Sequence, residues 1–278
     1  MMNKRGAFGK LLTYAVLTFG ALVCLFPFYW MLRTALADIS ELFQPDPALL
    51  PAVFNWNTFR DAMGAQPFDR FFLNSAIITG ANLAGVLLTA SLCAYGFSRL
   101  DWPGRDKVFG LLLTALMLPY AVLMIPHFVG WNYLGLTDTF APLIVPAFLG
   151  GGVFNIFLLR QFFMTIPRDL DEAAFIDGAS HLRVFSRIIL PIGKQSLIVV
   201  GLFTFLANWN DYLAPVIYLS SEKNYTLMLG LTLFQGQYNA QWNLMMAAVS
   251  LVVLPSLVLF LFAQRYFVEG IAMTGVKG

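Results

Sequence analysis

The stretch Leu244–Ala263, LMMAAVSLVVLPSLVLFLFA, contains 20 residues and no charged side chain. A helix of about 20 mostly apolar residues is long enough to cross the hydrocarbon core of a bilayer. Five other stretches meet this requirement, and they are roughly Leu11–Leu32, Phe71–Phe97, Val108–Gly130, Phe140–Leu159 and Leu197–Leu219. The sequence therefore predicts an all-α membrane protein with six transmembrane helices.

The composition of the chain agrees with this prediction. Of its 278 residues, 59% are hydrophobic and 12% are charged, whereas a soluble domain has about 45–50% apolar and about 25% charged residues. Little sequence is left for a soluble part, so residues 1–278 are expected to form a single transmembrane domain. Cys24 and Cys93 each lie inside an apolar stretch, where we interpret them as small interior hydrophobes and not as a disulfide or metal pair.

The distribution of lysine and arginine predicts the orientation of the chain. Thirteen of these 17 residues lie at the two termini and in the second and fourth connections, and four lie in the other connections. Positive residues concentrate on the cytoplasmic side of membrane proteins, so both termini are expected inside the cell. The first apolar stretch is about 22 residues long, against roughly 7–15 for a signal peptide, and is therefore expected to be an uncleaved transmembrane helix.

Three segments outside the spans are predicted to differ in role. The outer loop at about 33–70 carries four prolines, which forbid a continuous helix there. The inner connection at about 160–196 is the longest on the cytoplasmic side, and the tail at about 264–278 is cytoplasmic too. Several spans also contain helix breakers, which either kink ordinary helices or let the bundle bend and line a pathway; these are Pro119, Pro126, Pro142, Pro146, Gly150, Gly151, Gly152 and Pro215.

The inner connection contains the sequence RDLDEAAFIDGAS at Arg168–Ser180. Acidic residues in a first turn are favourable at the positive end of the helix dipole, and Gly178 can take the left-handed conformation that ends a helix. Ser180 is suited to cap a second helix. We therefore expect two short helices at the cytoplasmic surface, with a small-residue face that another protein could approach closely.

This pattern resembles the signature loop, or EAA motif, of the permease subunits of ATP-binding-cassette (ABC) importers. The resemblance rests on Glu172, Ala173, Ala174, Gly178, Ile188, Leu190 and Pro191, all at the family's spacing. Three other segments are similar to carbohydrate-uptake permeases of the maltose-transporter type, namely Arg160–Phe163, Asn208–Tyr212 and Gln264–Gly278. The resemblance implies a type I ABC importer permease fold in a bacterial or archaeal cytoplasmic (inner) membrane.

The resemblance also implies how such a subunit works. In this family the short coupling helix of the loop docks in a cleft of a separate ATPase, whose closure moves that helix as a rigid body. Ala173, Ala174 and Gly178 would permit close docking, and Glu172 and Asp177 would offer carboxylates. The implied partners are a second permease chain in a heterodimer, two ATPase copies that bind ATP and Mg²⁺, an extracytoplasmic solute-binding protein and membrane lipid. The chain itself is expected to bind no cofactor and no nucleic acid.

Polar residues inside a span usually face the interior of a bundle. The densest such group is Asn208, Trp209, Asn210, Asp211 and Tyr212. It combines hydrogen-bonding groups with aromatic rings and so suits a sugar in the translocation path. Alternatively, these residues form hydrogen bonds between helices, with Asp211 near the outer headgroups. Trp131, Asn132 and His127 are weaker candidates, and a lone histidine is more often a hydrogen-bonded interior residue than a proton relay.

Several catalytic patterns are absent from the sequence. It has no Gly-x-x-x-x-Gly-Lys-Ser/Thr phosphate loop, so the chain is not expected to hydrolyse ATP itself. Its two histidines, His127 and His181, do not form a metal-binding spacing, and there is no Gly-x-Ser-x-Gly nucleophile pattern. The predicted function is half of the translocation pathway for a sugar. The alternatives are the same machinery for a glycerol phosphate, another phosphate ester or a polyol, or a stand-alone secondary carrier or membrane enzyme.

Overall fold

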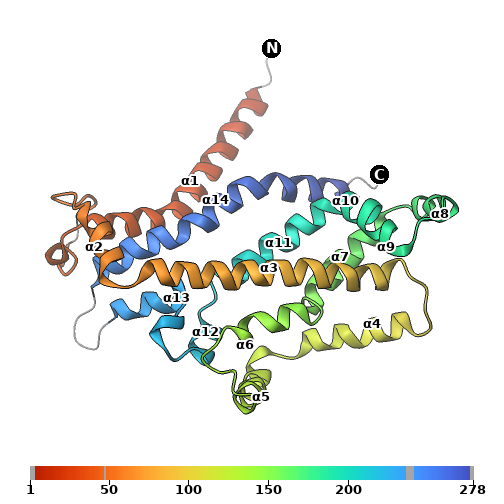
Figure 1. Cartoon of the computed structure of the whole chain (residues 1–278). Helices are drawn as coiled ribbons and strands as arrows, with labels where there is room; N and C mark the ends of the chain where they lie inside the picture. The colour runs from red at the N-terminus through yellow and green to blue at the C-terminus, as the bar shows by residue number, and fades with distance from the viewer. Residues whose placement is uncertain (1–3, 47, 236–240, 276–278) are drawn as a thin grey trace. The chain divides into compact units, whose positions relative to one another are not determined.

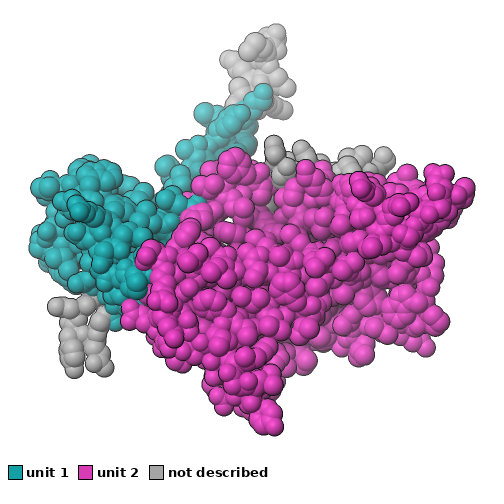
Figure 2. Space-filling model, viewed as in Figure 1, with its two compact units in different colours: residues 1–68, 231–254 teal, residues 69–230, 255–278 magenta. Residues whose placement is uncertain are grey.

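The computed structural model describes residues 4–46, 48–235 and 241–275, with side chains between Gly9 and Gln264 of these ranges. The chain divides into two compact units (Figure 2). Unit 1 comprises Met1–Phe68 with Leu231–Leu254, and unit 2 comprises Asp69–Gly230 with Pro255–Gly278. That both belong to one transmembrane domain stays a prediction. Of the tail segment Gln264–Gly278, the structure describes only one side chain, that of Gln264, so the predicted role of this tail lies outside the described residues.

Helices make up the regular structure of the described ranges, which contain no strand. Four helical segments are long and apolar enough to cross a membrane, and they are Gly9–Leu36, Phe68–Ser98, Ala141–Thr165 and Trp242–Gln264. Two bent pairs bring the number to six if each pair is one span: Arg105–Met117 with Tyr120–Tyr133, and His181–Ile192 with Lys194–Trp209. The predicted all-α membrane fold is confirmed.

Unit 1 contains α1 (Lys4–Leu36), η1 (Ile39–Glu41), α2 (Asn57–Ala65), η6 (Leu231–Phe234) and the first part of α14 (Trp242–Gly275), all labelled or coloured by position in Figure 1. Arg33, buried near the end of α1, holds the outer loop. Its Nε donates to the carbonyl of Ala48 at 3.0 Å, its Nη2 lies 3.5 Å from the Glu41 carboxylate, and its guanidinium lies 5.5 Å from the Trp30 ring centre. One cation thus folds the loop back onto α1.

Unit 2 is arranged around α3 (Phe68–Ser98), an unbroken helix of 31 residues. Its core packs α3 against α4 (Arg105–Thr114), α7 (Val153–Thr165), α9 (His181–Val184), η4 (Phe185–Ile189) and α11 (Lys194–Trp209). The buried core residues are Val86, Ala90, Ala94, Tyr95, Phe109, Ile156, Leu159, Phe163, Ile166, Val184, Phe185, Ile189 and Val200. The other described elements of this unit that precede Leu231 are η2 (Ala115–Met117), α5 (Tyr120–Tyr133), α6 (Ala141–Ile144), η3 (Val145–Phe148), α8 (Asp169–Ile176), α10 (Leu190–Ile192), α12 (Leu213–Tyr218), η5 (Glu222–Asn224) and α13 (Leu227–Gly230).

Three spans of unit 2 are interrupted. The third turns by 97° where Leu118 and Pro119 are extended, because proline disfavours a helical conformation in the residue before it. The fourth is interrupted by three consecutive glycines with positive φ at 150–152. The fifth predicted stretch, roughly 197–219, contains two helices, because α11 ends at Trp209 and α12 begins at Leu213. The helix breakers therefore reorient the chain in unit 2 instead of only kinking it.

Glycine is required where the fourth span crosses α3. A Cβ on Gly151 would lie 2.8 Å from the Ala90 Cβ and 3.0 Å from the carbonyl oxygen of Val86, and Gly151 has a φ of +68°. Both the close approach and the left-handed backbone exclude a larger residue.

Gly151→Ala should therefore lower the free energy of unfolding. We expect a loss of about 1–3 kcal/mol from overpacking, with roughly 1–2 kcal/mol more from the left-handed conformation, measured as a lower thermal midpoint in detergent. Gly104→Ala is the matched control, because Gly104 also has a positive φ, +84°, but a Cβ there would meet nothing within 4 Å. Equal shifts in the two variants would contradict the packing argument.

Candidate functional site

The predicted cytoplasmic helix pair forms at one end of unit 2. The first helix is α8, Asp169–Ile176, with an acidic first turn. It ends at Gly178, which has a φ of +77° and donates its N–H to the carbonyl of Phe175 at 3.0 Å. Ser180 then caps α9, since its Oγ accepts the N–H of Arg183 at 3.4 Å. The local structure of this coupling loop is therefore as the sequence predicts.

The signature residues of this loop divide into two groups. One group is exposed and available to a partner, and it consists of Glu172, Ala173, Asp177, Gly178 and Pro191. The other group packs against the core of unit 2, and it consists of Ala174, Ile188 and Leu190. Ala174, Ile188 and Leu190 thus attach the loop to the bundle, while Glu172, Ala173, Asp177, Gly178 and Pro191 face outward.

Two large apolar side chains on the same loop were not singled out from the sequence. Ile176 at the end of α8 is 86% exposed, and Leu182 in α9 is 68% exposed. Exposed apolar side chains beside charged ones are typical of surfaces that bind another protein. The sequence could not reveal them, because isoleucine and leucine carry no signal in a chain that is 59% hydrophobic.

A buried ion pair joins α8 to the end of α3. The Arg99 Nε lies 2.9 Å from Asp171 Oδ2, and the two side chains are 2% and 10% exposed. The Arg99 Nη2 donates to Asp171 Oδ1 at 3.2 Å, and the guanidinium also donates to the carbonyls of Ile166 at 2.8 Å and Pro167 at 3.2 Å. From the sequence, Arg99 is only one of the cytoplasmic cations, and Asp171 is only part of the acidic first turn of α8. Their pairing could not be predicted, because two residues 72 positions apart leave no local pattern.

A second, exposed set of ion pairs lies beside the buried one. Arg168 Nη1 lies 3.2 Å from Asp101 Oδ2, and Arg105 Nη1 lies 2.7 Å from Asp101 Oδ1. The hydrogen bond from Arg168 lowers the pKa of the Asp101 carboxyl below its usual range. Arg160 reaches Asp106 at 3.5 Å. Such exposed pairs contribute little to stability because water and salt screen them.

Away from this loop, unit 2 contains a polar cavity of about 250 Å³. It is lined by Ser75, Ile78, Asn82, Tyr120, His127, Trp131, Pro142, Leu143, Pro146, Ala147, Asn208, Asp211, Ala214, Pro215, Tyr218 and Thr226. Asn82 on α3 organises its wall, since its Nδ2 donates to Asn208 Oδ1 at 2.6 Å and to the carbonyl of Leu143 at 3.0 Å. The lining residues include one carboxylate, Asp211, and no lysine or arginine.

All three interrupted spans of unit 2 reach this cavity at or near their interruptions. Tyr120 is the first residue of α5 after the bend of the third span, Ala147 lies in η3 shortly before the glycines of the fourth, and Asp211 lies between α11 and α12. Irregular backbone at membrane depth is tolerated where protein or a water-filled cavity satisfies it. The helix breakers therefore shape this cavity.

The structure separates the predicted polar cluster. Asn208 and Asp211 line the cavity, together with the weaker candidates His127 and Trp131. Trp209 does not line it; its side chain is buried against Phe205 and Phe72, with ring centres 5.4 and 5.6 Å away. Asn210, Tyr212 and Asn132 do not line it either, and the Asn210 amide donates to the carbonyl of Leu206 at 2.9 Å. Consecutive residues across a helix end point in different directions, which explains the split.

Asp138 ties two connections of unit 2 together. Its backbone has an unusual positive φ of +58°, and its N–H donates to the carbonyl of Tyr218, a cavity residue, at 2.7 Å. Its carboxylate accepts the Ser220 and Ser221 N–H groups at 2.9 Å and the Ser221 hydroxyl. These donors hold the pKa of the Asp138 carboxyl far below its usual range.

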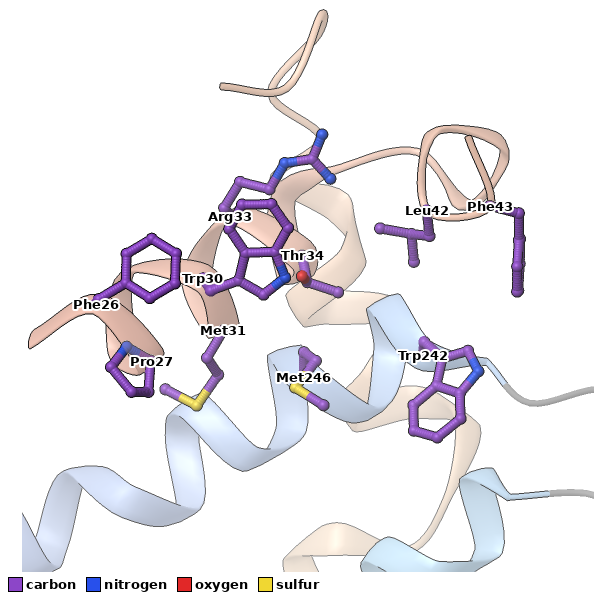
Figure 3. Close-up of a pocket in the computed structure, with 10 residues that line it drawn as sticks. All are labelled: Phe26, Pro27, Trp30, Met31, Arg33, Thr34, Leu42, Phe43, Trp242 and Met246. Atoms are coloured by element: carbon purple, nitrogen blue, oxygen red, sulfur yellow. The ribbon is translucent and has the colours of Figure 1, made fainter. Parts of the chain in front are cut away.

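Unit 1 has a different pocket of about 620 Å³ (Figure 3). Its lining is largely apolar and comes from α1, the loop after it and the start of α14, with Phe26, Pro27, Trp30, Met31, Thr34, Leu42, Phe43, Trp242 and Met246 around Arg33. Arg33 already binds Ala48 and Glu41. This pocket therefore offers few free polar groups for a sugar.

The chain matches known transport proteins over most of its length. Residues 81–272 match the family described as "Binding-protein-dependent transport system inner membrane component". The chain belongs to that family. It is 34% identical over 277 residues to the sn-glycerol-3-phosphate transport system permease protein UgpE of Pectobacterium atrosepticum, with 97% of each chain covered. It is 32% identical over 278 residues to the inner membrane ABC transporter permease protein YcjP of Escherichia coli (strain K12), with 99% of each covered.

A solved structure has the same fold. It is a bacterial ABC transporter involved in the import of the acidic polysaccharide alginate, with a TM-score of 0.83, 21% identity, and 96% of this chain and 99% of that chain covered. Together these matches confirm the predicted class: the protein is a multi-pass permease subunit of a binding-protein-dependent ABC importer in the bacterial inner membrane.

Asp138→Asn should loosen the connection beside the cavity, because an amide lacks the charge that binds the three donors. We expect the thermal midpoint to fall by about 2–4 °C, for a loss on the order of 1 kcal/mol, while Asp61→Asn on the exposed face of α2 should leave it unchanged. The folded pKa is lowered, so the stabilisation is complete above the unfolded value of about 3.9 and is lost as the pH falls through the folded pKa. The difference from wild type should thus stay constant from about pH 8 to about pH 5; a difference that shrinks within this window would contradict the assignment.

Proposed function

We propose that this permease forms half of the translocation pathway for a neutral sugar and that α8 couples it to a separate ATPase. The observation that carries the sugar assignment is the polar cavity of unit 2, on which three interrupted spans converge. The sequence alone suggested sugar contact by the whole 208–212 cluster. The proposal now rests on Asn82, Asn208, Asp211, His127 and Trp131.

The chemistry of this cavity suits a neutral polyhydroxy solute. Amide and carboxylate groups from Asn208 and Asp211 can bind hydroxyl groups, and the rings of Trp131, Tyr120 and Tyr218 can lie against the apolar face of a pyranose. A volume of about 250 Å³ suits one sugar ring more than an extended chain. Longer carbohydrates would pass one residue at a time.

The alternative keeps the machinery and changes the solute to a glycerol phosphate, another phosphate ester or a polyol. It is favoured by the relative named for sn-glycerol-3-phosphate transport. A phosphate group is usually bound by arginine, lysine or a helix N-terminus. The cavity lining instead presents Asp211, whose negative charge repels a phosphate. The local charge therefore favours the neutral solute, and membership of the family argues against a stand-alone carrier or a membrane enzyme.

The proposed assembly contains a second permease, two ATPase copies and a solute-binding protein. A related structure is described as a bacterial alginate ABC transporter in complex with an alginate pentasaccharide-bound periplasmic protein, with a TM-score of 0.69 to this chain. The exposed Ile176 and Leu182 beside Glu172 and Asp177 give the coupling loop the mixed apolar and acidic surface that docking to an ATPase would use. ATP and Mg²⁺ would bind to that partner and not to this chain.

The docking proposal is tested by Gly178→Leu. A Cβ at Gly178 meets nothing within 4 Å inside the chain, so the added side chain would project into the partner interface. We expect at least about a tenfold loss of ATPase co-purification and uptake, which corresponds to roughly 1.4 kcal/mol, with unchanged insertion into the membrane. Gly104→Leu controls for backbone strain, since Gly104 has a φ of +84° and lies outside the coupling loop. Normal uptake by Gly178→Leu would overturn the docking role.

The sugar proposal is tested by uptake in proteoliposomes containing the complete importer. Asp211→Asn and Trp131→Ala should each lower uptake of a neutral sugar by about 10-fold or more, the cost of roughly 1–3 kcal/mol for a lost polar or aromatic contact. Asn210→Ala is the control, because Asn210 adjoins Asp211 but does not line the cavity. Wild-type transport of sn-glycerol 3-phosphate in place of neutral sugars, improved by Asp211→Asn, would establish the alternative.

A further inference from the structure

Arg99 holds the first turn of α8 from two sides at once. Its guanidinium faces the Asp171 carboxylate as a fork, with Nη2 donating to Oδ1 and Nε in ionic contact with Oδ2, and it donates to the carbonyls of Ile166 and Pro167 just before the helix. A planar guanidinium with several fixed bonds allows less movement than a single ion pair. The pair is almost fully removed from water, so its bonds are not exchanged for bonds to solvent.

The helix that ends at Ser98, directly before Arg99, also reaches the polar cavity. Asn82 lies 17 residues before Arg99, about 25 Å along a helix at 1.5 Å per residue. Its amide holds Asn208 and the carbonyl of Leu143. Between the two points α3 has no interruption, whereas the third, fourth and fifth spans of unit 2 are all broken. α3 is therefore an unbroken connection between Arg99 and the cavity.

We propose that Arg99 is a positioning residue that makes α8 and α3 move as one body, so that displacement of α8 reaches Asn82 and the cavity. The inference rests on the proposed docking of α8 to an ATPase. Without the Arg99–Asp171 fork, α8 would still bind the ATPase. Movement of α8 would then bend the chain at residues 166–168 and would not displace α3. ATP would then be hydrolysed without opening the cavity.

The chain supplies a matched control for this proposal. Arg168 and Asp101 also join the start of α8 to the segment after α3, at 3.2 Å, but their side chains are 53% and 69% exposed. The two pairs connect the same parts of the chain with the charges reversed, and they differ in burial, in the carbonyl contacts and in the second partner of Asp101, Arg105. Breaking the exposed pair should have little effect.

The experiment uses the complete importer in lipid nanodiscs and proteoliposomes, with Asp171→Asn compared with Asp101→Asn. We expect Asp171→Asn to keep the ATPase bound but to lower the solute transported per ATP by at least about fivefold, the lower end of typical coupling between sites. Asp101→Asn should stay within about twofold of wild type. Arg99→Lys keeps the charge but loses the fork, and it should also be defective. The measured quantity is the amount of solute transported divided by the amount of ATP hydrolysed in the same assembled complexes. A variant that assembles less complex lowers both amounts equally and leaves their ratio unchanged.

A second readout separates transmission from simple folding of the loop. Spin labels at Leu170 in α8 and Leu92 in α3, in a background with Cys24→Ser and Cys93→Ala, report the distance between the two helices. In wild type this distance should not change when ATP closes the ATPase, because the helices move together. In Asp171→Asn it should change or broaden. An unchanged distance and a normal transport ratio in Asp171→Asn would overturn the inference, whereas absence of a bound ATPase in wild type would overturn the proposed function instead.

Discussion

A backbone group in the hydrocarbon core of a bilayer has no water to bind, and this constraint organises unit 2. Each break in a spanning helix must be covered by protein or open onto a wet cavity. The breaks of three spans bring Tyr120, Ala147 and Asp211 to one cavity, and Asn82 from the unbroken α3 donates to the carbonyl of Leu143 there. Polar groups that would be costly against lipid thus become the walls of the cavity that we propose as the solute path.

A different constraint ties the cytoplasmic loop to α3. An eight-residue helix outside the bundle has little stability of its own, so its position depends on attachments to the bundle. Ala174, Ile188 and Leu190 supply apolar attachments, and Arg99 supplies a directional one. Burying an ion pair costs free energy because both charges lose their hydration. The pair therefore adds little net stability unless its hydrogen-bonding groups find partners. Here the carbonyls of Ile166 and Pro167 accept hydrogen bonds from Nη1 and Nη2, whereas the buried Nε is in ionic contact with Asp171 without an aligned hydrogen bond, so the pair defines geometry more than it adds stability.

Charge at the cavity is the feature from which we propose the class of solute. The cavity contains a carboxylate and no cation among its lining residues, and we therefore propose a neutral solute, although one relative is named for sn-glycerol-3-phosphate transport and a solved structure of this fold for import of the acidic polysaccharide alginate. A shared fold does not imply a shared solute, because the solute is recognised by a few side chains that can change while the helices remain.

The sequence by itself determined the membrane class and the local structure of the coupling loop, and it predicts the orientation. These follow from apolar runs, counts of cations, and short-range signals such as Gly178 and Ser180, which act through neighbouring backbone groups. It also marked the helix breakers but not what they do. The tertiary structure decided that only Asn208 and Asp211 of the 208–212 cluster face the cavity, that Asn82 and Asp138 organise its surroundings, and that Arg99 binds Asp171. These contacts join residues far apart in the chain, and their chemistry depends on burial and direction, which no local pattern of residues encodes.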